Sequence, residues 1–300
     1  MTLTAFAPAK VNLFLHVGPA GADGYHPICS LMAFADIGDR LSIQAAEAPT
    51  FEVTGPFAGE LGDGADNLVV RAARALLTSV PGPKPPFQLI LDKRLPVAAG
   101  LGGGSSDAGA ALRLLRDALE LPVSDETLEA IAADLGSDGV ACLWTRTVVA
   151  EGRGEQLSDA PRMPVLDAVL ANPLVHSSTA AVYRAFDDTG AHGSPDCPRL
   201  PDTIETAEEL AAFLSLCRND LQAPAMGLNP VIGEVLDTLA SEPEVLLARM
   251  SGSGATCFAL CASDIEAEGL AERLRILRPR WWIQRCRIGA PRLGELPRRG

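Results

Sequence analysis

The chain has little positive charge, and this limits the partners it can have. Its 300 residues include 25 lysines and arginines against 38 aspartates and glutamates, which gives a net charge of −13. Nucleic acids and anionic membrane surfaces attract basic proteins, so neither is expected as a partner. Lysine is especially scarce, since Lys10, Lys84 and Lys93 are the only three. A lysine beside a site for an anionic ligand would therefore be notable.

The sequence also lacks the segments that direct a protein into or through a membrane. No run of about 18 uninterrupted apolar residues could span a bilayer. The N-terminus has no basic segment followed by an apolar run, which a signal peptide requires. The seven cysteines form no Cys-x-x-Cys pair and mostly lie in apolar stretches: Cys29, Cys142, Cys197, Cys217, Cys257, Cys261 and Cys286. This distribution is typical of buried thiols in a reducing cytosol rather than of disulfides or zinc sites, so we expect a cytoplasmic protein.

The familiar nucleotide-binding fingerprints are missing as well. The most glycine-rich stretch is Pro96–Asp107, with the sequence PVAAGLGGGSSD. No Gly-Lys-Ser/Thr follows, so the stretch is not a P-loop, and position 105 is a serine where a dinucleotide fingerprint requires glycine. A flexible linker is the default interpretation of such glycine runs. The flanking segments argue against a linker, because 87–91 alternates like a strand and an amphipathic helix is predicted from about Ser105.

The glycine stretch is therefore predicted to bind phosphate in some other way. Glycines allow several backbone amides to converge, and the positive end of a helix adds to the attraction for an anion. Ser105 or Ser106 is expected to cap the helix through its hydroxyl.

The rest of the chain predicts an α+β protein with two parts. The length allows one large domain or two ordinary ones, and 47% hydrophobic with 21% charged residues is typical of a globular protein. Strands are expected at 3–7, 11–17, 30–35 and 39–45, and a boundary at Pro161–Pro164. Strands and helices alternate after it, with a long loop at 187–203.

Several polar residues are candidates for a site, although each has an ordinary interpretation too. Lys10 is expected at the start of a strand, beside a turn fixed by Pro8, where a lysine is most often simply solvated. Tyr25 and His26 follow an Asp-Gly turn, and Tyr25 and Tyr183 are the only tyrosines. Ser178 or Thr179 is expected to cap the helix that carries Tyr183.

Three segments together resemble a known family more specifically than any one does alone. Pro8–Asn12 (PAKVN), Pro96–Asp107 and Ser251–Ala255 (SGSGA) resemble, in order and spacing, the three motifs of the GHMP kinases, which phosphorylate small molecules. The resemblance spans nearly the whole chain. It implies a two-domain GHMP kinase fold, with a ribosomal-protein-S5-like N-terminal domain at 1–160 and a ferredoxin-like α/β sandwich at 161–300.

Within that family the sequence is most similar to the branch acting on cytidine-diphospho-methylerythritol in the non-mevalonate isoprenoid pathway. Ala22–His26 (ADGYH) is the discriminating element, and Asp66–Leu68 (DNL) and Asp92–Pro96 (DKRLP) add to the similarity. The resemblance implies transfer of the γ-phosphoryl group of ATP to the 2-hydroxyl of the methylerythritol unit, with Mg²⁺ neutralising the phosphates. Oligomeric state and metal ligands remain open.

The resemblance also implies a role for individual residues. Asp138 would be the base that accepts the hydroxyl proton, and Lys10 would keep it ionised and stabilise the developing charge. Tyr25 and Tyr183 would stack on cytosine, His26 would bind its edge, and Asn12 and Thr179 would contact the substrate. ATP would be bound by the following residues: Asn67, Lys93, Pro96, Val97, Ala98, Ala99, Gly100, Leu101, Gly102, Gly103, Gly104, Ser105 and Ser106.

One departure from the family and two rival functions follow from the sequence. The aspartate after the Leu-Gly turn is normally followed by Val-Pro, but Asp138 is followed by Gly139-Val140, so we expect a looser turn. A dinucleotide-dependent oxidoreductase would need the missing glycine at 105. A non-catalytic nucleotide-binding relative would be expected to have lost Lys10 or Asp138. Within the family, homoserine or mevalonate is the competing substrate, and the ADGYH element argues against both.

Overall fold

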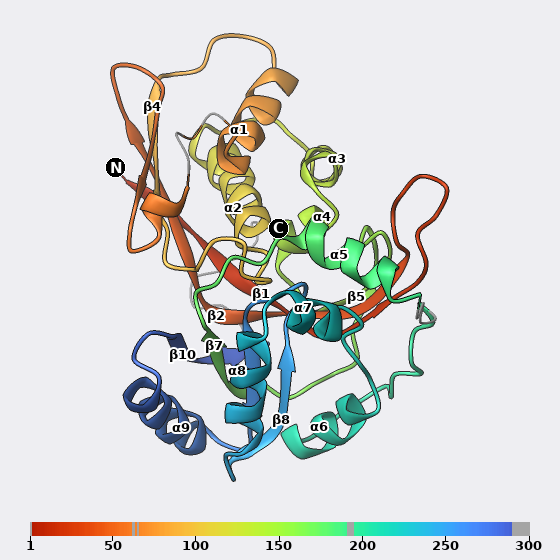
Figure 1. Cartoon of the computed structure of the whole chain (residues 1–300). Helices are drawn as coiled ribbons and strands as arrows, with labels where there is room; N and C mark the ends of the chain where they lie inside the picture. The colour runs from red at the N-terminus through yellow and green to blue at the C-terminus, as the bar shows by residue number, and fades with distance from the viewer. Residues whose placement is uncertain (1, 62–63, 65, 191–194, 290–300) are drawn as a thin grey trace.

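The computed structural model describes residues 2–61, 64, 66–190 and 195–289, and a long β-hairpin runs through its centre (Figure 1). The hairpin consists of β1 (Leu3–Val17) and β2 (Ile28–Ala45), which pair antiparallel from Leu3↔Ile43 to Val17↔Ile28. The sequence predicted two short strands in place of each. Both predicted breaks between the short strands were wrong. β1 and β2 stay paired past Pro8, through a register shift between Pro8 and Lys10. A strand can accommodate proline at such an irregularity, since no ladder hydrogen bond needs its missing N–H.

The first half of the chain builds a layer of helices on one side of this hairpin. β3 (Thr50–Thr54) lies parallel to β4 (Phe87–Asp92), which pairs antiparallel with one half of β2. The helical layer packs on β1 and β2 mainly through α2, and it consists of α1 (Leu68–Ser79), α2 (Gly103–Ala118), α3 (Asp125–Leu135) and α4 (Gly139–Trp144). A single 3₁₀ turn, η1 (Ala58–Glu60), precedes α1.

A second hairpin extends the other half of β2. β5 (Val148–Gly152) pairs with β2 from Ile28↔Gly152 to Met32↔Val148, and β6 (Gln156–Asp159) pairs with β5. The turn between these two strands contains Arg153 and Gly154. This turn therefore lies beside the start of β2.

The second half of the chain forms its own antiparallel strands with helices against them. The strands follow the order β10-β7-β9-β8: β7 (Leu166–Asn172), β8 (Val245–Met250), β9 (Cys257–Cys261) and β10 (Trp282–Ile288). β10 joins β2 through Ile288↔Ala35. The helices are α5 (Thr179–Asp188), α6 (Ala207–Ser215), α7 (Gln222–Leu228), α8 (Val231–Ala240) and α9 (Asp264–Leu277).

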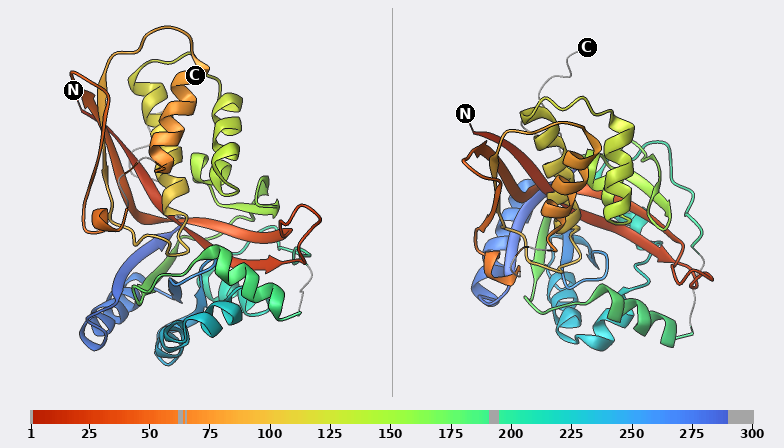
Figure 2. Two further views of the ribbon diagram at one scale, coloured as in Figure 1. Left: turned by 45° about the horizontal axis from the view of Figure 1, so that its top comes forward. Right: turned by 90° about the horizontal axis from the view of Figure 1, so that it is seen from above.

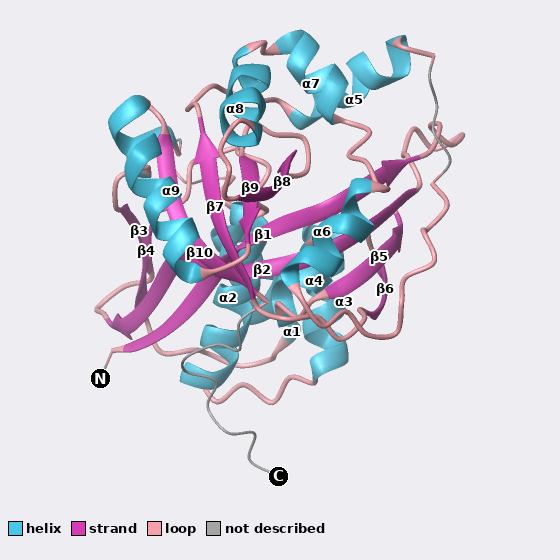
Figure 3. Ribbon diagram, turned by 90° about the horizontal axis from the view of Figure 1, so that it is seen from below, coloured by secondary structure: helices cyan, strands magenta, loops and turns pink. Residues whose placement is uncertain are grey.

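The helices of the two halves lie on opposite sides of the central hairpin. In the left view of Figure 2, those coloured orange to yellow-green lie above it and those coloured green to blue lie below. Figure 3 shows α8 and α9 in front of β7, β9 and β10, with α1 and α2 behind. Three buried apolar clusters fill the spaces between these layers. The domain boundary at residues 160 and 161 stays a prediction.

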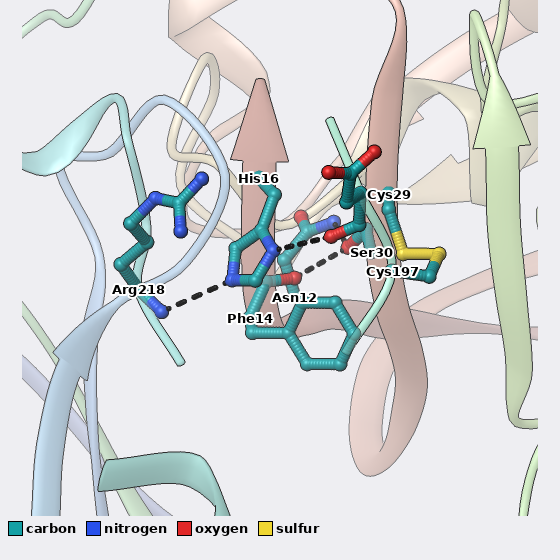
Figure 4. The surroundings of a disulfide bond; sticks show 8 residues. Asn12, Phe14, His16, Cys29, Ser30, Cys197 and Arg218 are labelled. Atoms are coloured by element: carbon teal, nitrogen blue, oxygen red, sulfur yellow. Dashed lines mark hydrogen bonds between the residues drawn. A yellow bond between two sulfur atoms is a disulfide. The ribbon is translucent and has the colours of Figure 1, made fainter. Parts of the chain in front are cut away.

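A disulfide between Cys29 and Cys197 overturns the expectation that all cysteines are free. The bond ties β2 to the segment around Cys197, with the two Cα atoms 5.3 Å apart (Figure 4). The other five cysteines are free and buried, as predicted. Cysteine spacing could not reveal this pair, because residues 29 and 197 meet only through the tertiary fold. Residues 191–194 of the predicted loop lie outside the described residues.

No helix in the described ranges combines the length and the apolar character that crossing a membrane requires.

Candidate active site

A cleft of about 500 Å³ brings residues of the three sequence motifs together. It lies where the central hairpin, the glycine stretch and the start of α5 meet. Of the predicted site residues, those lining it are Lys10, Asn12, Asn67, Lys93, Pro96, Val97, Ala98, Ala99, Gly100, Gly102, Gly103, Gly104, Ser105, Asp138, Thr179 and Tyr183. Gly252 and Ser253 of the third motif line it too. The shared cleft is what the separate motifs predicted.

Two residues of the glycine stretch do not line the cleft but hold the stretch against β1. Leu101 is buried, and its carbonyl accepts the backbone N–H of Lys10 at 2.8 Å. Ser106 is also buried, and its hydroxyl donates to the carbonyl of Pro8 at 2.6 Å. Both bonds fix the stretch to β1. The loop is therefore held against the strand that carries Lys10.

Neither serine caps α2, which corrects the sequence prediction. The helix begins at Gly103, and its N-cap is Gly102 in the left-handed conformation, with φ 60° and ψ 20°. The hydroxyl of Ser106 is already used by Pro8. The first-turn amides of a helix have no acceptor within it, so those of Gly103, Gly104 and Ser105 remain available to an anion.

The third motif closes on the glycine stretch through contacts too close for a side chain. A Cβ on Gly100, where φ is +77°, would lie 2.3 Å from the carbonyl oxygen of Ser251. The hydroxyl of Ser251 donates to the carbonyl of Gly100 at 2.9 Å and accepts the backbone N–H of Asn12 at 3.1 Å. Glycine at 100 is therefore required for the two halves of the chain to meet here.

An ion pair between Lys10 and Asp138 stands at the centre of the lining. The Lys10 Nζ atom is 2.9 Å from Oδ2 of Asp138 and donates to Oδ1 of Asn12 at 2.7 Å. The Lys10 side chain is 6% exposed, whereas that of Asp138 is 26% exposed. Asn12 in turn donates to the hydroxyl of Ser30 at 2.8 Å. Lys10 is thus fixed, and the carboxylate remains accessible from the cleft.

The turn that carries Asp138 is held by packing rather than by a proline. Asp138 is the N-cap residue of α4, and its carbonyl accepts the N–H of Cys142 at 2.9 Å. A Cβ on Gly139 would lie only 1.8 Å from the carbonyl oxygen of Ala132 in α3. The glycine that we expected to loosen the turn therefore lets α4 approach α3 closely.

Lys93 lines the cleft, but its ammonium group is bound beneath the glycine stretch. Nζ lies 2.6 Å from Oδ2 of Asp39 and 2.7 Å from Oδ2 of Asp107, and all three side chains are buried. The other oxygen of Asp39 accepts the backbone N–H groups of Arg94 and Leu95. Burial raises the pKa of Asp107 to about 7 in spite of Lys93. This cluster joins β2, the end of β4 and the first turn of α2.

The three residues predicted to bind cytosine do not all line the cleft. Tyr183 lines the cleft, burial raises its pKa to about 12, and its ring centre is 4.9 Å from that of His26. The Nδ1–H of His26 donates to the carbonyl of Gly18 at 2.9 Å. Tyr25 is 57% exposed, and the guanidinium of Arg153 lies over its ring. Tyr25 and His26 are not among the residues that line the cleft.

The lining residues that were not predicted include Ser253, Asp107 and Arg153. Ser253 shares a 2.8 Å hydrogen bond between its hydroxyl and that of Thr179, and its place in the SGSGA motif could have indicated it. Asp107 ends the quoted glycine stretch, and its Oδ1 has no partner among the described residues. For Arg153 the sequence gave no indication of a role in the site beyond its position between two glycines.

Comparison with known proteins places the chain among kinases of small molecules. Models of the GHMP kinase N-terminal and C-terminal domains match residues 67–146 and 197–278. A 4-diphosphocytidyl-2-C-methyl-D-erythritol kinase of Caulobacter vibrioides strain NA1000 is 64% identical over 96% of this chain and 100% of its own. A 4-diphosphocytidyl-2-C-methyl-D-erythritol kinase of Cereibacter sphaeroides is 46% identical over 95% of this chain and 98% of its own.

Solved structures agree with the sequence relatives. A 4-(cytidine 5'-diphospho)-2C-methyl-D-erythritol kinase aligns with a TM-score of 0.77 and 32% identity, covering 96% of this chain and 100% of its own. A mevalonate kinase of L. major aligns with a TM-score of 0.69 over 96% of both chains. At 16% identity that second likeness shows the fold alone.

Proposed function

The chain belongs to the 4-diphosphocytidyl-2-C-methyl-D-erythritol kinases of the GHMP kinase family, and from this premise we propose a role for each part of the cleft. The reaction is phosphorylation of the 2-hydroxyl of 4-diphosphocytidyl-2-C-methyl-D-erythritol by ATP, which gives the 2-phosphate and ADP in the non-mevalonate isoprenoid pathway. The observation that carries the proposal is the Lys10–Asp138 pair beside the free amides of the glycine stretch. We place the enzyme in the cytoplasm.

Asp138 is the base in this proposal. An alcohol is a weak nucleophile, so a carboxylate within hydrogen-bond reach assists by accepting the hydroxyl proton as the bond to phosphorus forms. The Asp138 carboxylate is accessible from the cleft, whereas Lys10 is fixed by Asn12. The Lys10 ammonium stabilises the negative charge that develops on the substrate oxygen and the transferred phosphoryl group.

The glycine stretch binds the phosphates of ATP. Backbone amides at the start of α2 and the positive end of that helix attract them. Asn67 lines the cleft and serves the adenine end. Lys93 acts by holding the stretch in place, because its ammonium already binds Asp39 and Asp107.

The cleft has oxygen donors of the kind that Mg²⁺ prefers. Magnesium sites of this type use one or two protein oxygens, with substrate phosphates and water as the other ligands. Ser105 lines the cleft and would hold the ion, whereas the hydroxyl of Ser106 is buried against Pro8. When bound, Mg²⁺ neutralises phosphate charge.

The substrate occupies the side of the cleft formed by Asn12, Thr179 and Tyr183. We assign the cytosine to Tyr25, His26 and Tyr183, with His26 held in orientation by Gly18. In the described structure the guanidinium of Arg153 lies over the ring of Tyr25.

The test is ADP release by the purified protein with ATP and Mg²⁺. Cytidine-diphospho-methylerythritol is compared with free methylerythritol phosphate, homoserine and mevalonate. Turnover with the cytidine compound alone is the expected result. Turnover with another alcohol would retain the kinase fold and refute the cytosine assignment.

The Asp138→Asn variant tests the base directly. Asparagine keeps the size of the side chain but cannot accept the proton, so kcat is expected to fall by a factor on the order of 10² or more. The KM for ATP is expected to change little. An unchanged kcat would mean that the transfer needs no base at this position.

A further inference from the structure

We propose that Arg153 binds the diphosphate group of the substrate and so selects for an alcohol linked to a nucleoside diphosphate. The inference rests on the proposed function, because it adds a binding residue to the same cleft. Arg153 lies in the turn between β5 and β6 and lines the cleft. Its backbone N–H donates to the carboxylate of Glu155 at 2.6 Å, which fixes the turn.

Arg153 is the basic residue of the lining that is left for the diphosphate once Lys10 and Lys93 have the roles given above. In the described part of the chain, the lysines and arginines that line the cleft are Lys10, Lys93 and Arg153. Lys93 is buried between two carboxylates, and Lys10 is paired with Asp138. The Arg153 side chain is 50% exposed, and it pairs with Asp23, which is 47% exposed. Exposed pairs contribute only about 0–1 kcal/mol, so a phosphate can displace Asp23 at little cost.

The position of Arg153 lies between the two ends of the expected substrate. Its guanidinium carbon is 4.2 Å from the centre of the Tyr25 ring, at the end assigned to the base. On the other side its neighbour Gly154 approaches Ser137, since a Cβ on Gly154 would lie 3.2 Å from the Ser137 carbonyl oxygen. Ser137 directly precedes Asp138. A substrate with its base near Tyr25 and its hydroxyl near Asp138 must place the diphosphate between them.

The chemistry of the guanidinium suits this task. Its planar set of N–H donors forms paired hydrogen bonds with phosphate oxygens, which a lysine ammonium cannot match. The contact with the Tyr25 ring holds the plane of the group. Alcohols without a diphosphate, such as homoserine, would not gain from this residue. Arg153 would therefore contribute to substrate selection as well as to affinity.

The experiment compares the binding of CDP and of cytidine by calorimetry. The Arg153→Gln variant is expected to reduce the ratio of CDP to cytidine affinity about tenfold or more, since a charge-assisted pair to phosphate is lost. Arg287→Gln is the matched control, because Arg287 is 47% exposed, pairs with Asp36 on the surface and does not line the cleft. It is expected to leave the ratio unchanged.

A second variant separates binding from ordering of the turn. Asp23→Asn removes the ion pair but leaves Arg153, so it is expected to retain or tighten CDP binding. If Asp23→Asn weakened CDP binding as much as Arg153→Gln, the ion pair and not the arginine would matter, and the proposal would be wrong. If Arg153→Gln weakened the binding of cytidine and of CDP equally, the proposal would also be wrong, because Arg153 would then contribute only to binding the cytidine part.

Turnover distinguishes this inference from the proposed function. In Arg153→Gln, the KM for cytidine-diphospho-methylerythritol is expected to rise about tenfold or more, with kcat and the KM for ATP within about twofold of wild type. Wild-type protein that fails to phosphorylate this compound would refute the proposed function itself. Wild-type turnover with no change in the variant's KM would refute only the role of Arg153.

Discussion

The charge of Lys93 stabilises the structure beneath the cleft and does not bind a ligand. It neutralises Asp39 and Asp107 beneath the glycine stretch, and all three side chains are almost fully buried. The sequence placed Lys93 near ATP but could not indicate that two carboxylates would bind its ammonium. Those carboxylates come from β2, 54 residues away in the sequence, and from α2, 14 residues away.

The Lys93→Met variant tests this structural role. Removing the ammonium leaves two buried carboxylates without their partner, so the free energy of unfolding is expected to fall by about 3–5 kcal/mol. Urea unfolding measures the loss. Lys84→Met is the control, since Lys84 contacts only backbone carbonyls of its own loop. A loss below about 1 kcal/mol for Lys93→Met would show that the cluster relaxes without cost.

His16 gives the fold a dependence on pH. Its Nδ1–H donates to the carbonyl of Asp196 at 3.1 Å, and its Nε2 accepts the backbone N–H of Arg218 at 3.3 Å, so the ring is neutral (Figure 4). Burial is the main cause that lowers its pKa. The hydrogen bond to the Asp196 carbonyl and the charge of Asp220 oppose this, and Arg218 and Arg249 add to it. The unfolded chain therefore binds a proton more readily than the folded protein as the pH falls below about 6.5.

The His16→Gln variant should lose that dependence. Stability from a histidine with a lowered pKa is present above the unfolded value and is lost as the pH falls through it. The difference in unfolding free energy between wild type and variant is expected to shrink from pH 7.5 to pH 5. Urea unfolding across this range measures it, with His176→Gln, an exposed histidine, as control. A difference that is independent of pH would contradict the assignment.

At the scale of elements, α4 depends on a close approach to α3. Gly139 allows that approach, and Asp138 at the start of α4 is positioned by it. No helix was predicted for this segment from the sequence. Six residues are too few for helical periodicity to be decisive, so only packing against α2 and α3 defines α4.

The Gly139→Val variant tests the role of this contact. A side chain there would clash with the carbonyl of Ala132 and push α4 away, so we expect a loss of about 1–3 kcal/mol in stability. Because Asp138 moves with α4, kcat is expected to fall more than the KM for ATP changes. Gly136→Ala is the control, since its Cβ would meet nothing within 4 Å and its backbone is extended, with φ 164° and ψ 162°. Equal effects of the two changes would refute the packing argument.

Of the two helix caps predicted from the sequence, one is right and one is wrong. Ser178 caps α5 by accepting the N–H of Ala181, whereas the N-cap of α2 is Gly102 and not Ser105 or Ser106. The short α7 and the strand β8 were missed. Local patterns specify caps, whereas short elements are stabilised by neighbours that the local sequence does not describe.

At the scale of the molecule, the disulfide links segments that are 168 residues apart in the chain. A cross-link over so long a loop stabilises mainly by restricting the unfolded chain, by roughly 2–5 kcal/mol. It holds the segment around Cys197 against the hairpin, where the carbonyl of Asp196 meets His16. The bond therefore stabilises the contact between the second half of the chain and the central strands.

The Cys197→Ser variant measures this contribution. Its urea midpoint is expected to lie below that of oxidised wild type, and dithiothreitol should lower the wild-type midpoint to that of the variant. Dithiothreitol should leave the variant unchanged. Seven reactive thiols in unfolded, unreduced wild type would show that the bond does not form in solution.

The sequence by itself determined the family, the reaction and most of the residues of the cleft. Motifs such as PAKVN and the glycine stretch carry that information because phosphate binding needs particular residue types at short spacing. Only the tertiary structure decided how Lys93 is used, where Cys29 finds its partner and that Arg153 reaches the cleft. Each of these depends on contacts between residues that lie far apart in the chain, and such contacts leave no local pattern.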